Sequence, residues 1–300
     1  MTAPAPRLPD PDLMALDAAI DRALVTGDES GLDILGYGEV SCVVSWRIGE
    51  QELACKRLPL FDDADTWGRY RSAFHDYLDA LAAAGVAPLP AALQSLGRAD
   101  QRVSVYCVQP RLAGARVLSR HLHEVSPERA LELFDRVCQH VLAAVGPRLG
   151  LDGQLSNWVV DDDGALAYLD VTTPMLRGDD GRERLPLGLF LASLPWALRG
   201  LVRRFMLQGI LDKYYQPRGV ILDLLGNLHK ERLEALLPAF LAHAQGLVQP
   251  AITEAEVRRY YKDDASTWAL LQRLRRLDRA WQRGVRRRPY PFLLPGAIER

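Results

Sequence analysis

The segment Asp152-Gly-Gln-Leu-Ser-Asn157, followed by Leu169-Asp170, decides how this sequence is expected to fold. Two apolar runs, 158–160 and 166–169, lie on either side of Asp161-Asp162-Asp163-Gly164, which is a turn signal. The pattern predicts a short β-hairpin that is flanked by oxygen-bearing side chains.

Three side chains with oxygen atoms flank the hairpin: Asp152, Asn157 and Asp170. Mg²⁺ prefers a few carboxylate or amide oxygens together with phosphate oxygens, and Asn157 and Asp170 supply such oxygens. Phosphoryl transfer also needs a carboxylate that orients the attacking hydroxyl and receives its proton. Asp152 suits that catalytic role. The hairpin therefore predicts a phosphoryl-transfer site.

A glycine-rich segment lies upstream and reads Gly36-Tyr37-Gly38-Glu39-Val40-Ser41-Cys42-Val43. Its glycines and small serine allow backbone amides to approach phosphate oxygens. A dinucleotide-binding fingerprint would need a helix directly after the glycines. A second strand is expected here instead, which favours a β-hairpin covering phosphates. The alternative is an ordinary glycine-containing β-turn.

The next strand contains Ala54-Cys55-Lys56, in which one cation stands within an apolar run. Its ammonium group could reach an α- or β-phosphate held under the preceding hairpin. The alternative is a solvated lysine that protects a strand edge.

Hydrophobic periodicity divides the chain into a strand-rich first third and a mostly helical remainder, which predicts an α+β protein. Helices are expected at 10–26, 64–84, 126–146 and after Pro186, and strands at 33–44, 52–58 and 103–108. Asp10 is the expected N-cap of the first helix, and Ser126 that of the third.

The glycine-rich loop, the strand lysine, the Asp-x4-Asn loop and the later aspartate occur in the order seen in protein kinases. The chain, over roughly residues 33–175, resembles the protein-kinase-like superfamily. Because the segment after Asp170 is short and lacks an Ala-Pro-Glu marker, it is more similar to the aminoglycoside and choline phosphotransferase branch.

The resemblance implies a two-lobed protein-kinase-like fold that binds ATP and Mg²⁺ between its lobes. A tail and helix would cover 1–26, a small antiparallel-sheet lobe 27–110, and a mostly helical lobe 111–300. Gln109-Pro110-Arg111 would face the adenine as the hinge. The nucleotide-binding residues implied are Gly36, Gly38, Ser41, Val43, Ala54, Lys56 and Gln109.

Several positions depart from the family pattern. Gly150 stands where the histidine that braces the catalytic loop is expected, which predicts a looser loop. Gln154 replaces a lysine or histidine that helps to hold the transferred phosphate, and Val171-Thr172 replaces Phe-Gly. The helix that should offer Lys56 a glutamate has only Asp76 and Asp79. Asp76 could reach the lysine, or it could lie on a solvated helix face.

Composition narrows the class of protein. With 300 residues, 48% hydrophobic content and a formal net charge of −1, the chain can bury a large core and is not expected to coat nucleic acid. The four cysteines are widely spaced, which indicates reduced thiols. No secretory leader is recognised, and the apolar stretch 185–198 is too short to span a bilayer. We therefore expect a cytoplasmic protein without a membrane span.

The C-terminal third contains no recognised catalytic motif. Its end is rich in arginine between Arg273 and Arg288, with Trp268 and Trp281 interleaved. A solvated amphipathic helix explains this composition, and a nucleic acid, anionic lipid or acidic partner is the alternative. The residues that could line an acceptor pocket, or simply face solvent, are Lys213, Tyr214, Arg218, His229 and Lys230.

Three functions remain open on the sequence. The first is ATP-dependent phosphorylation of a hydroxyl on an unknown small-molecule acceptor, with Asp152 as the base. The second is a pseudokinase-like scaffold or switch that binds nucleotide without turnover, suggested by Gly150 and Gln154. The third is nucleotidyl transfer on the same fold.

Overall fold

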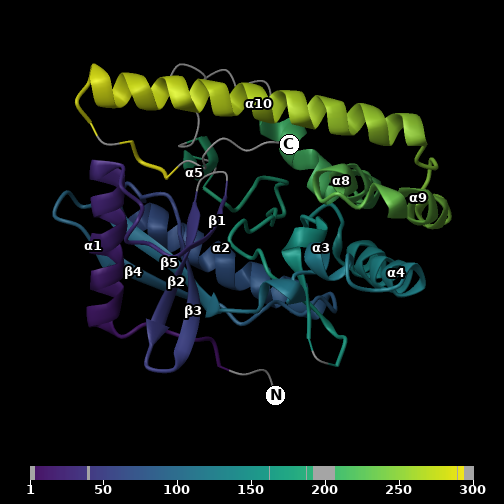
Figure 1. Ribbon diagram of the computed structural model, residues 1–300, viewed down its shortest axis with the longest axis horizontal. Coiled ribbons are helices and arrows are strands. Elements are labelled where there is room, and N and C mark those ends of the chain that lie inside the picture. Colours follow the sequence, from purple (N-terminus) through teal and green to yellow (C-terminus); the bar gives the residue numbers. More distant parts are fainter. Residues whose placement is uncertain are drawn as a thin grey trace.

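The computed structural model describes residues 4–38, 41–161, 163–186, 188–191, 207–288 and 290–293. It is α+β, as predicted, with a small antiparallel sheet beside a larger group of helices (Figure 1). The strands are β1 (Ile34–Tyr37), β2 (Cys42–Ile48), β3 (Gln51–Arg57), β4 (Ala92–Gly97), β5 (Val103–Pro110), β6 (Trp158–Val160) and β7 (Leu166–Tyr168). The α-helices are α1 (Asp10–Thr26), α2 (Ala64–Ala83), α3 (Leu118–His121), α4 (Pro127–Ala144), α5 (Gly188–Leu191), α7 (Leu207–Asp212), α8 (Pro217–Lys230), α9 (Leu237–Gln245) and α10 (Glu254–Gly284).

The main sheet has five antiparallel strands in the order β1-β2-β3-β5-β4, and α2 connects β3 to β4. The run 33–44 contains β1 and the start of β2, which pair as the β-hairpin expected at the glycine-rich segment. β4 is not predicted from the sequence; it forms a hairpin with β5, the next strand along the chain. A second sheet consists of β6 and β7, which form the predicted hairpin.

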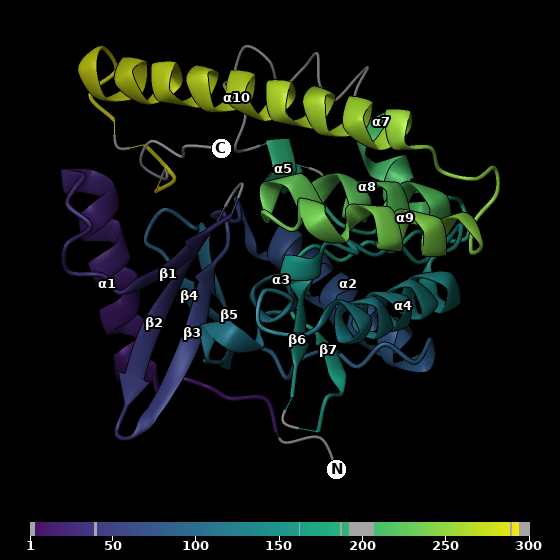
Figure 2. The ribbon, with the colours of Figure 1, turned by 45° about the vertical axis from the view of Figure 1, so that its right-hand side comes forward.

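Each face of the five-stranded sheet is covered by a different helix. On one face, Val44, Leu53 and Cys55 are buried with the apolar side of α1. Val105 and Cys107 point to the other face, where they join the large core that includes α2. Figure 2 shows α1 on the side of the sheet away from the hairpin β6–β7. The face toward the hairpin is therefore the one that can meet residues of the helical part.

Ion pairs fasten α1 to its face of the sheet. Asp21 on α1 accepts a hydrogen bond from buried Arg57 of β3 at 2.9 Å and also pairs with Arg98. Helix α1 begins at Asp10 with Pro9 as its N-cap, so the predicted Asp10 cap is wrong by one position. Asp10 instead lies in the first helical turn, where its negative charge interacts favourably with the positive end of the helix dipole.

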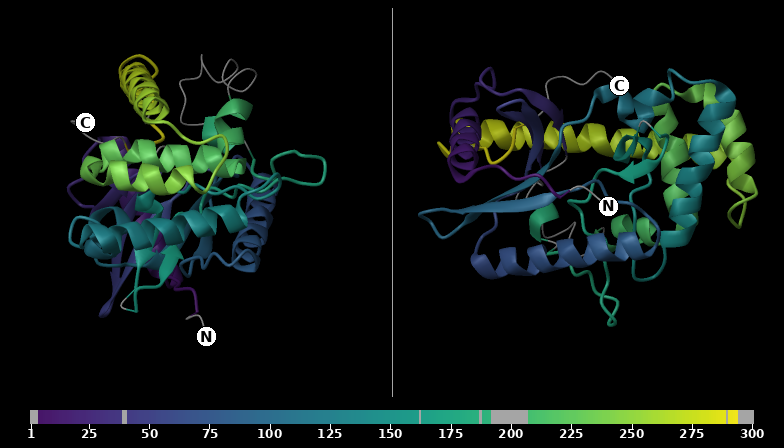
Figure 3. Two further views of the ribbon diagram at one scale, coloured as in Figure 1. Left: turned by 90° about the vertical axis from the view of Figure 1, so that its right-hand side faces the viewer. Right: turned by 90° about the horizontal axis from the view of Figure 1, so that it is seen from below.

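The helical part is built in layers. α4 packs on α8 and α9, and α8 packs on α10, which Figure 3 shows from the end of the molecule. The predicted N-cap of α4 is confirmed, since the Ser126 side chain accepts a hydrogen bond from the backbone N–H of Arg129. No helix among the described residues is long and apolar enough to cross a membrane. Part of the apolar stretch 185–198 and part of the predicted helix after Pro186 fall outside the described residues.

Candidate functional site

An ion pair joins the five-stranded sheet to the β6–β7 hairpin. The ammonium group of Lys56 on β3 lies 2.8 Å from Oδ1 of Asp170, which follows β7 and is 114 residues away in sequence. Their side chains are 17% and 34% exposed. The pair is thus partly open to solvent, so a ligand can reach it.

Asp170 is held by several donors on a single oxygen. The backbone N–H and the hydroxyl of Thr172 donate to Oδ1 at 3.2 and 2.8 Å. Burial raises the pKa of Asp170, but the Lys56 charge and these bonds outweigh it and hold the pKa below its usual value. Within the described residues Oδ2 accepts no hydrogen bond, so this oxygen is available to a cation.

Asn157 lies at the same, open end of the hairpin as Asp170, and Asp152 lies in the loop that leads into β6. Asn157 donates its side-chain N–H to the carbonyl of Asp152 at 3.3 Å, and its own carbonyl accepts from Leu169 at 2.7 Å. Its amide oxygen accepts no hydrogen bond from the described residues and can therefore bind a ligand. The hairpin thus brings together the three side chains that the sequence singles out around it.

The carboxylate of Asp152 is held by its own loop. Oδ1 accepts from the backbone N–H of Gln154 at 3.2 Å, and Oδ2 lies 3.5 Å from the Gln154 side-chain nitrogen. Burial, and after it the nearby negative charge of Asp223, raises the pKa of Asp152 to about 7. A carboxyl group with this pKa can accept and release a proton near neutral pH.

Four of the expected nucleotide-binding residues share one face of the sheet. Val43 pairs with Lys56 across β2 and β3, and Ala54 pairs with Gln109 across β3 and β5. This is the face opposite α1. The side chain of Gln109 donates to the carbonyl of Leu169 at 3.0 Å, so it also links the sheet to the hairpin.

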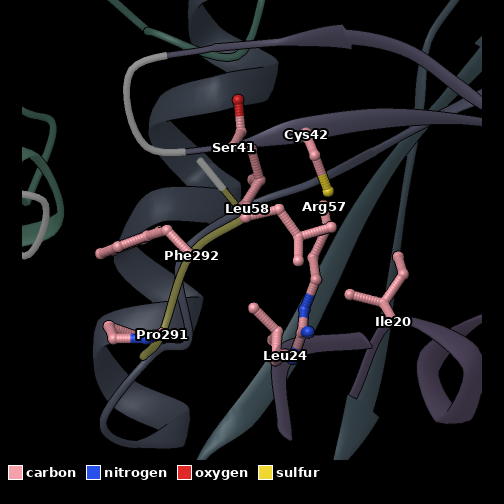
Figure 4. Close-up of a pocket in the computed structure, with 9 residues that line it drawn as sticks. Ile20, Leu24, Ser41, Cys42, Arg57, Leu58, Pro291 and Phe292 are labelled. Carbon is pink, nitrogen blue, oxygen red and sulfur yellow. The ribbon is translucent and has the colours of Figure 1, made fainter. Parts of the chain in front are cut away.

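The glycine-rich segment forms a turn between β1 and β2. Gly36 pairs with Val43, and the N–H of Gly38 donates to the carbonyl of Ser41 at 2.8 Å. Ser41 is 9% exposed and lines a cavity of about 20 Å³ together with Phe292 of the C-terminal segment, drawn in Figure 4. A cavity of this size holds a water molecule but no nucleotide, so a phosphate would have to meet the turn from its other side.

Lys56 takes its acidic partner from the hairpin and not from α2. Asp76 pairs with Arg184 and accepts from Ser72, and Asp79 is exposed. Asp76 thus pairs with a partner at the surface and Asp79 is exposed, so the solvated helix face describes both.

Two tyrosines connect α2 to the loops of the site. Tyr70 donates to the carbonyl of Thr172 at 2.9 Å, and Tyr77 donates to the carbonyl of Gly150 at 3.1 Å. A Cβ atom at Gly150 would lie 3.0 Å from Cβ of Met175 and 3.1 Å from the carbonyl oxygen of Tyr214. Close packing therefore accounts for the glycine, and the loop is braced there by Tyr77, contrary to the expectation of a looser loop.

A second polar cluster lies beside Asp152. Asp223 on α8 is 2% exposed, and its Oδ1 lies 3.2 Å from the ammonium of Lys213 and accepts from the hydroxyl of Tyr260. Its Oδ2 lies 3.4 Å from the side-chain nitrogen of Gln154. Sequence reasoning missed Asp223, although an acidic residue inside the apolar run 220–228 is a signal of a buried charge.

The residues considered for an acceptor pocket separate into two groups. Lys213 reaches Asp223, and the ammonium of Lys230 lies 3.5 Å from the side-chain oxygen of Gln154. Arg218 instead pairs with Glu256, and the ring of His229 lies 4.8 Å from that of Tyr261. The ammonium of Lys213 lies over the ring of Tyr214, 4.6 Å from the ring centre. Of this set, Lys213 is linked to the loop of Asp152 through Asp223, and Lys230 is linked to it through Gln154.

The chemistry of the donors fits a magnesium ion that is also bound by phosphates. The described part of the chain has no group of three or more His, Cys, Asp or Glu side chains that could hold a metal ion by itself. Asn157 and Asp170 offer one amide oxygen and one carboxylate oxygen. Mg²⁺ is usually bound by one or two such groups, with phosphates and water completing its shell.

Comparison with known proteins identifies a family but no activity. No curated protein matches the chain. A family model described as "Family of unknown function (DUF6206)" matches residues 15–279, which is most of the sequence. The chain therefore belongs to the DUF6206 family.

Proposed function

We propose that this protein is an ATP- and Mg²⁺-dependent phosphotransferase with a two-lobed, protein-kinase-like fold, acting on a hydroxyl group of a small molecule. The observation that carries the proposal is the 2.8 Å pair between Lys56 and Asp170, formed beside Asp152 and Asn157. A cation for phosphates, two metal ligands and a base are the parts that phosphoryl transfer requires.

The arrangement of elements supports the kinase-like part of the proposal. Lys56 stands on β3 and α2 follows that strand, as the lysine strand and helix αC do in protein kinases. The five-stranded sheet would be the small lobe, and the helices from α3 onward the large one. The hairpin β6–β7 would then present Asp170 toward the sheet.

The sheet face opposite α1 is suited to ATP. Val43 and Ala54 offer small apolar contacts for the adenine, and Lys56 offers its ammonium to the α- and β-phosphates. Asn157 and Asp170 would hold Mg²⁺, which neutralises charge on the β- and γ-phosphates. Lys56 would exchange part of its contact with Asp170 for phosphate oxygens when nucleotide binds.

Asp152 would orient the acceptor hydroxyl and take its proton as the oxygen attacks the γ-phosphorus, while the bond from that phosphorus to the β–γ bridging oxygen breaks and ADP leaves. Its pKa of about 7 suits a base that works near neutral pH. The Gln154 side-chain contact at 3.5 Å is long, so an acceptor hydroxyl can replace it. Lys230, whose ammonium reaches Gln154, would then lie close to the acceptor.

A nucleotide-binding scaffold is the second candidate, and one observation favours it. Both oxygens of Asp152 already have a Gln154 nitrogen within 3.5 Å, so the carboxylate is satisfied without a substrate. Labelled ATP separates the candidates. Transfer of the γ-label to a metabolite supports the phosphotransferase, transfer of the α-label supports nucleotidyl transfer, and nucleotide binding without transfer of either label supports the scaffold.

Thermal unfolding with nucleotide tests the site itself. Saturating ATP should raise the melting temperature only with Mg²⁺ or Mn²⁺, by about 3 °C or more, because ligand at a hundred times its Kd stabilises by about 2.7 kcal/mol. Asp170→Ala should abolish that shift, whereas Asp163→Ala, in the exposed hairpin turn, should keep it. Equal shifts in Asp170→Ala and wild type would remove Asp170 from the metal site.

A further inference from the structure

The second half of α10 carries a row of apolar side chains that faces solvent. Leu270, Leu277, Trp281 and Val285, the last just past the helix end, are 58%, 67%, 49% and 59% exposed. They are four of the eight large hydrophobic side chains that are exposed in the described chain. Large exposed apolar groups gathered on one element usually mark an interaction surface.

These residues lie on one side of the helix. At 100° per residue their positions, with half-buried Leu274 between them, fall within an arc of about 80°. The row covers about 24 Å along the helix axis at 1.5 Å per residue. We call these five residues the apolar row.

Contacts on other sides of α10 fix the direction in which the apolar row points. Tyr260, in its first half, donates to Asp223 on α8, and Arg275 is 1% exposed. Near its end, Arg283 donates to the carbonyl of Leu24 on α1 at 3.1 Å. Figures 1 and 2 show the helix running along one side of the molecule, from α8 to the region above α1. The row is therefore presented on the outside of a helix that is held at both ends.

The sequence around the row is strongly basic. Between residues 265 and 293 the chain has eight arginines and a single acidic residue, Asp278. Arg273 is exposed on α10 about 40° from the edge of the row, and Arg286, Arg287 and Arg288 are exposed directly after it. An apolar row with a tryptophan and flanking arginines has the composition of a helix that lies in a membrane interface.

We infer that the apolar row and its arginines dock on the surface of an anionic phospholipid bilayer, with α10 parallel to the membrane plane. The leucines and Trp281 would enter the boundary between headgroups and acyl chains, and the arginines would contact lipid phosphates. This surface is separate from the proposed nucleotide site and does not depend on its function.

Charge complementarity favours this partner over a second copy of the chain. Two copies paired along their apolar rows would bring arginines against arginines, with only Asp278 to offset the repulsion. Nucleic acid would satisfy the arginines but would leave the leucines between them exposed, since phosphate contacts come from cations. A bilayer with anionic headgroups satisfies both kinds of side chain.

Vesicle flotation with the full chain tests the inference. The protein should float with vesicles of phosphatidylcholine and phosphatidylserine in equal parts and remain unbound with phosphatidylcholine alone, and added salt should weaken the binding. The double variant Leu277→Glu, Trp281→Glu should lose at least about tenfold in partitioning, because two charges replace inserted apolar groups. Met14→Glu, at a 61% exposed position on α1, is the matched control and should bind as wild type does.

A second pair of variants separates the electrostatic contribution. Arg273→Gln with Arg286→Gln should weaken binding to the anionic vesicles severalfold, and Arg69→Gln with Arg71→Gln on α2 should not. Undiminished binding by the Glu double variant would overturn the inference. Two other results would also overturn it. In the first, the wild type binds no vesicles and forms a dimer that the Glu double variant dissociates. In the second, the wild type binds no vesicles but binds duplex DNA, and the Glu double variant keeps that DNA binding.

Discussion

Two lysine–aspartate pairs lie near Asp152, and they differ in how the carboxylate is surrounded. In the Lys56–Asp170 pair the acidic side chain is 34% exposed and its three donors all bind Oδ1. In the Lys213–Asp223 pair the acidic side chain is 3% exposed and both oxygens have donors, Lys213 and Tyr260 on one and Gln154 on the other.

The difference indicates two kinds of task. A carboxylate with one oxygen left over can bind a cation, whereas a buried carboxylate with both oxygens used holds its neighbours in place and acts on them through its charge. Under the proposed function, Asp223 would be a positioning residue that helps to raise the pKa of Asp152, and Asp170 would be a metal ligand. Four measurements can break or sharpen this comparison.

Stability should respond most strongly at the buried Lys213–Asp223 pair. Lys213→Met leaves Asp223 buried without its counter-charge and should lower the free energy of unfolding by about 3 kcal/mol. Lys56→Met leaves Asp170 with access to water and should lower it by less than about 1 kcal/mol. Urea unfolding of the two variants measures the difference, and equal losses would contradict the distinction between the pairs.

Asp152 should be needed for catalysis but not for nucleotide binding. Asp152→Asn removes the proton acceptor and should slow phosphoryl transfer about a hundredfold or more, with the MgATP-induced rise in melting temperature kept. Asp163→Asn, in the hairpin turn, is the control and should transfer at the wild-type rate. If Asp152→Asn transfers phosphate as fast as wild type, Asp152 is not the base.

The pH profile should report the environment of Asp152. Because the base acts when ionised and its pKa is about 7, kcat should rise about tenfold between about pH 6 and pH 8. The raised pKa also means that the folded state binds this proton more tightly, so the contribution of Asp152 to stability falls as pH rises from about 4 to 7.

Asp223→Asn sharpens the same measurement. Removing the neighbouring negative charge should lower the pKa of Asp152 and move the midpoint of the kcat profile to lower pH. A midpoint that stays in place would show that Asp223 does not act on Asp152 through its charge.

The smallest effect is expected at the partly exposed Lys56–Asp170 pair. Lys56→Met should weaken ATP binding about tenfold, which corresponds to about 1.4 kcal/mol, because one phosphate-binding cation is lost. Lys262→Met on α10, at an exposed position, should leave ATP affinity unchanged. Isothermal titration with MgATP measures both, and wild-type affinity in Lys56→Met would contradict the role of the lysine.

Much of the local structure could be predicted because it depends on short-range patterns. The helical spacing of Trp67, Tyr70 and Phe74 predicts α2, and the apolar runs around an aspartate-rich turn predict β6 and β7; all three are confirmed. The strand β4 could not be predicted, since Ala92–Gly97 has little strand character and depends on pairing with β5.

The sequence by itself determined the order of the candidate site residues, the α+β class and the hairpin that brings Asn157 near Asp170. Only the tertiary structure decided which of these side chains contact one another. Lys56 meets Asp170 across 114 residues, and Asp223 reaches the loop of Asp152 from α8. Periodicity and turn chemistry act within a few residues of each position, whereas these contacts depend on how the sheet, the hairpin and the helices pack, which no local pattern specifies.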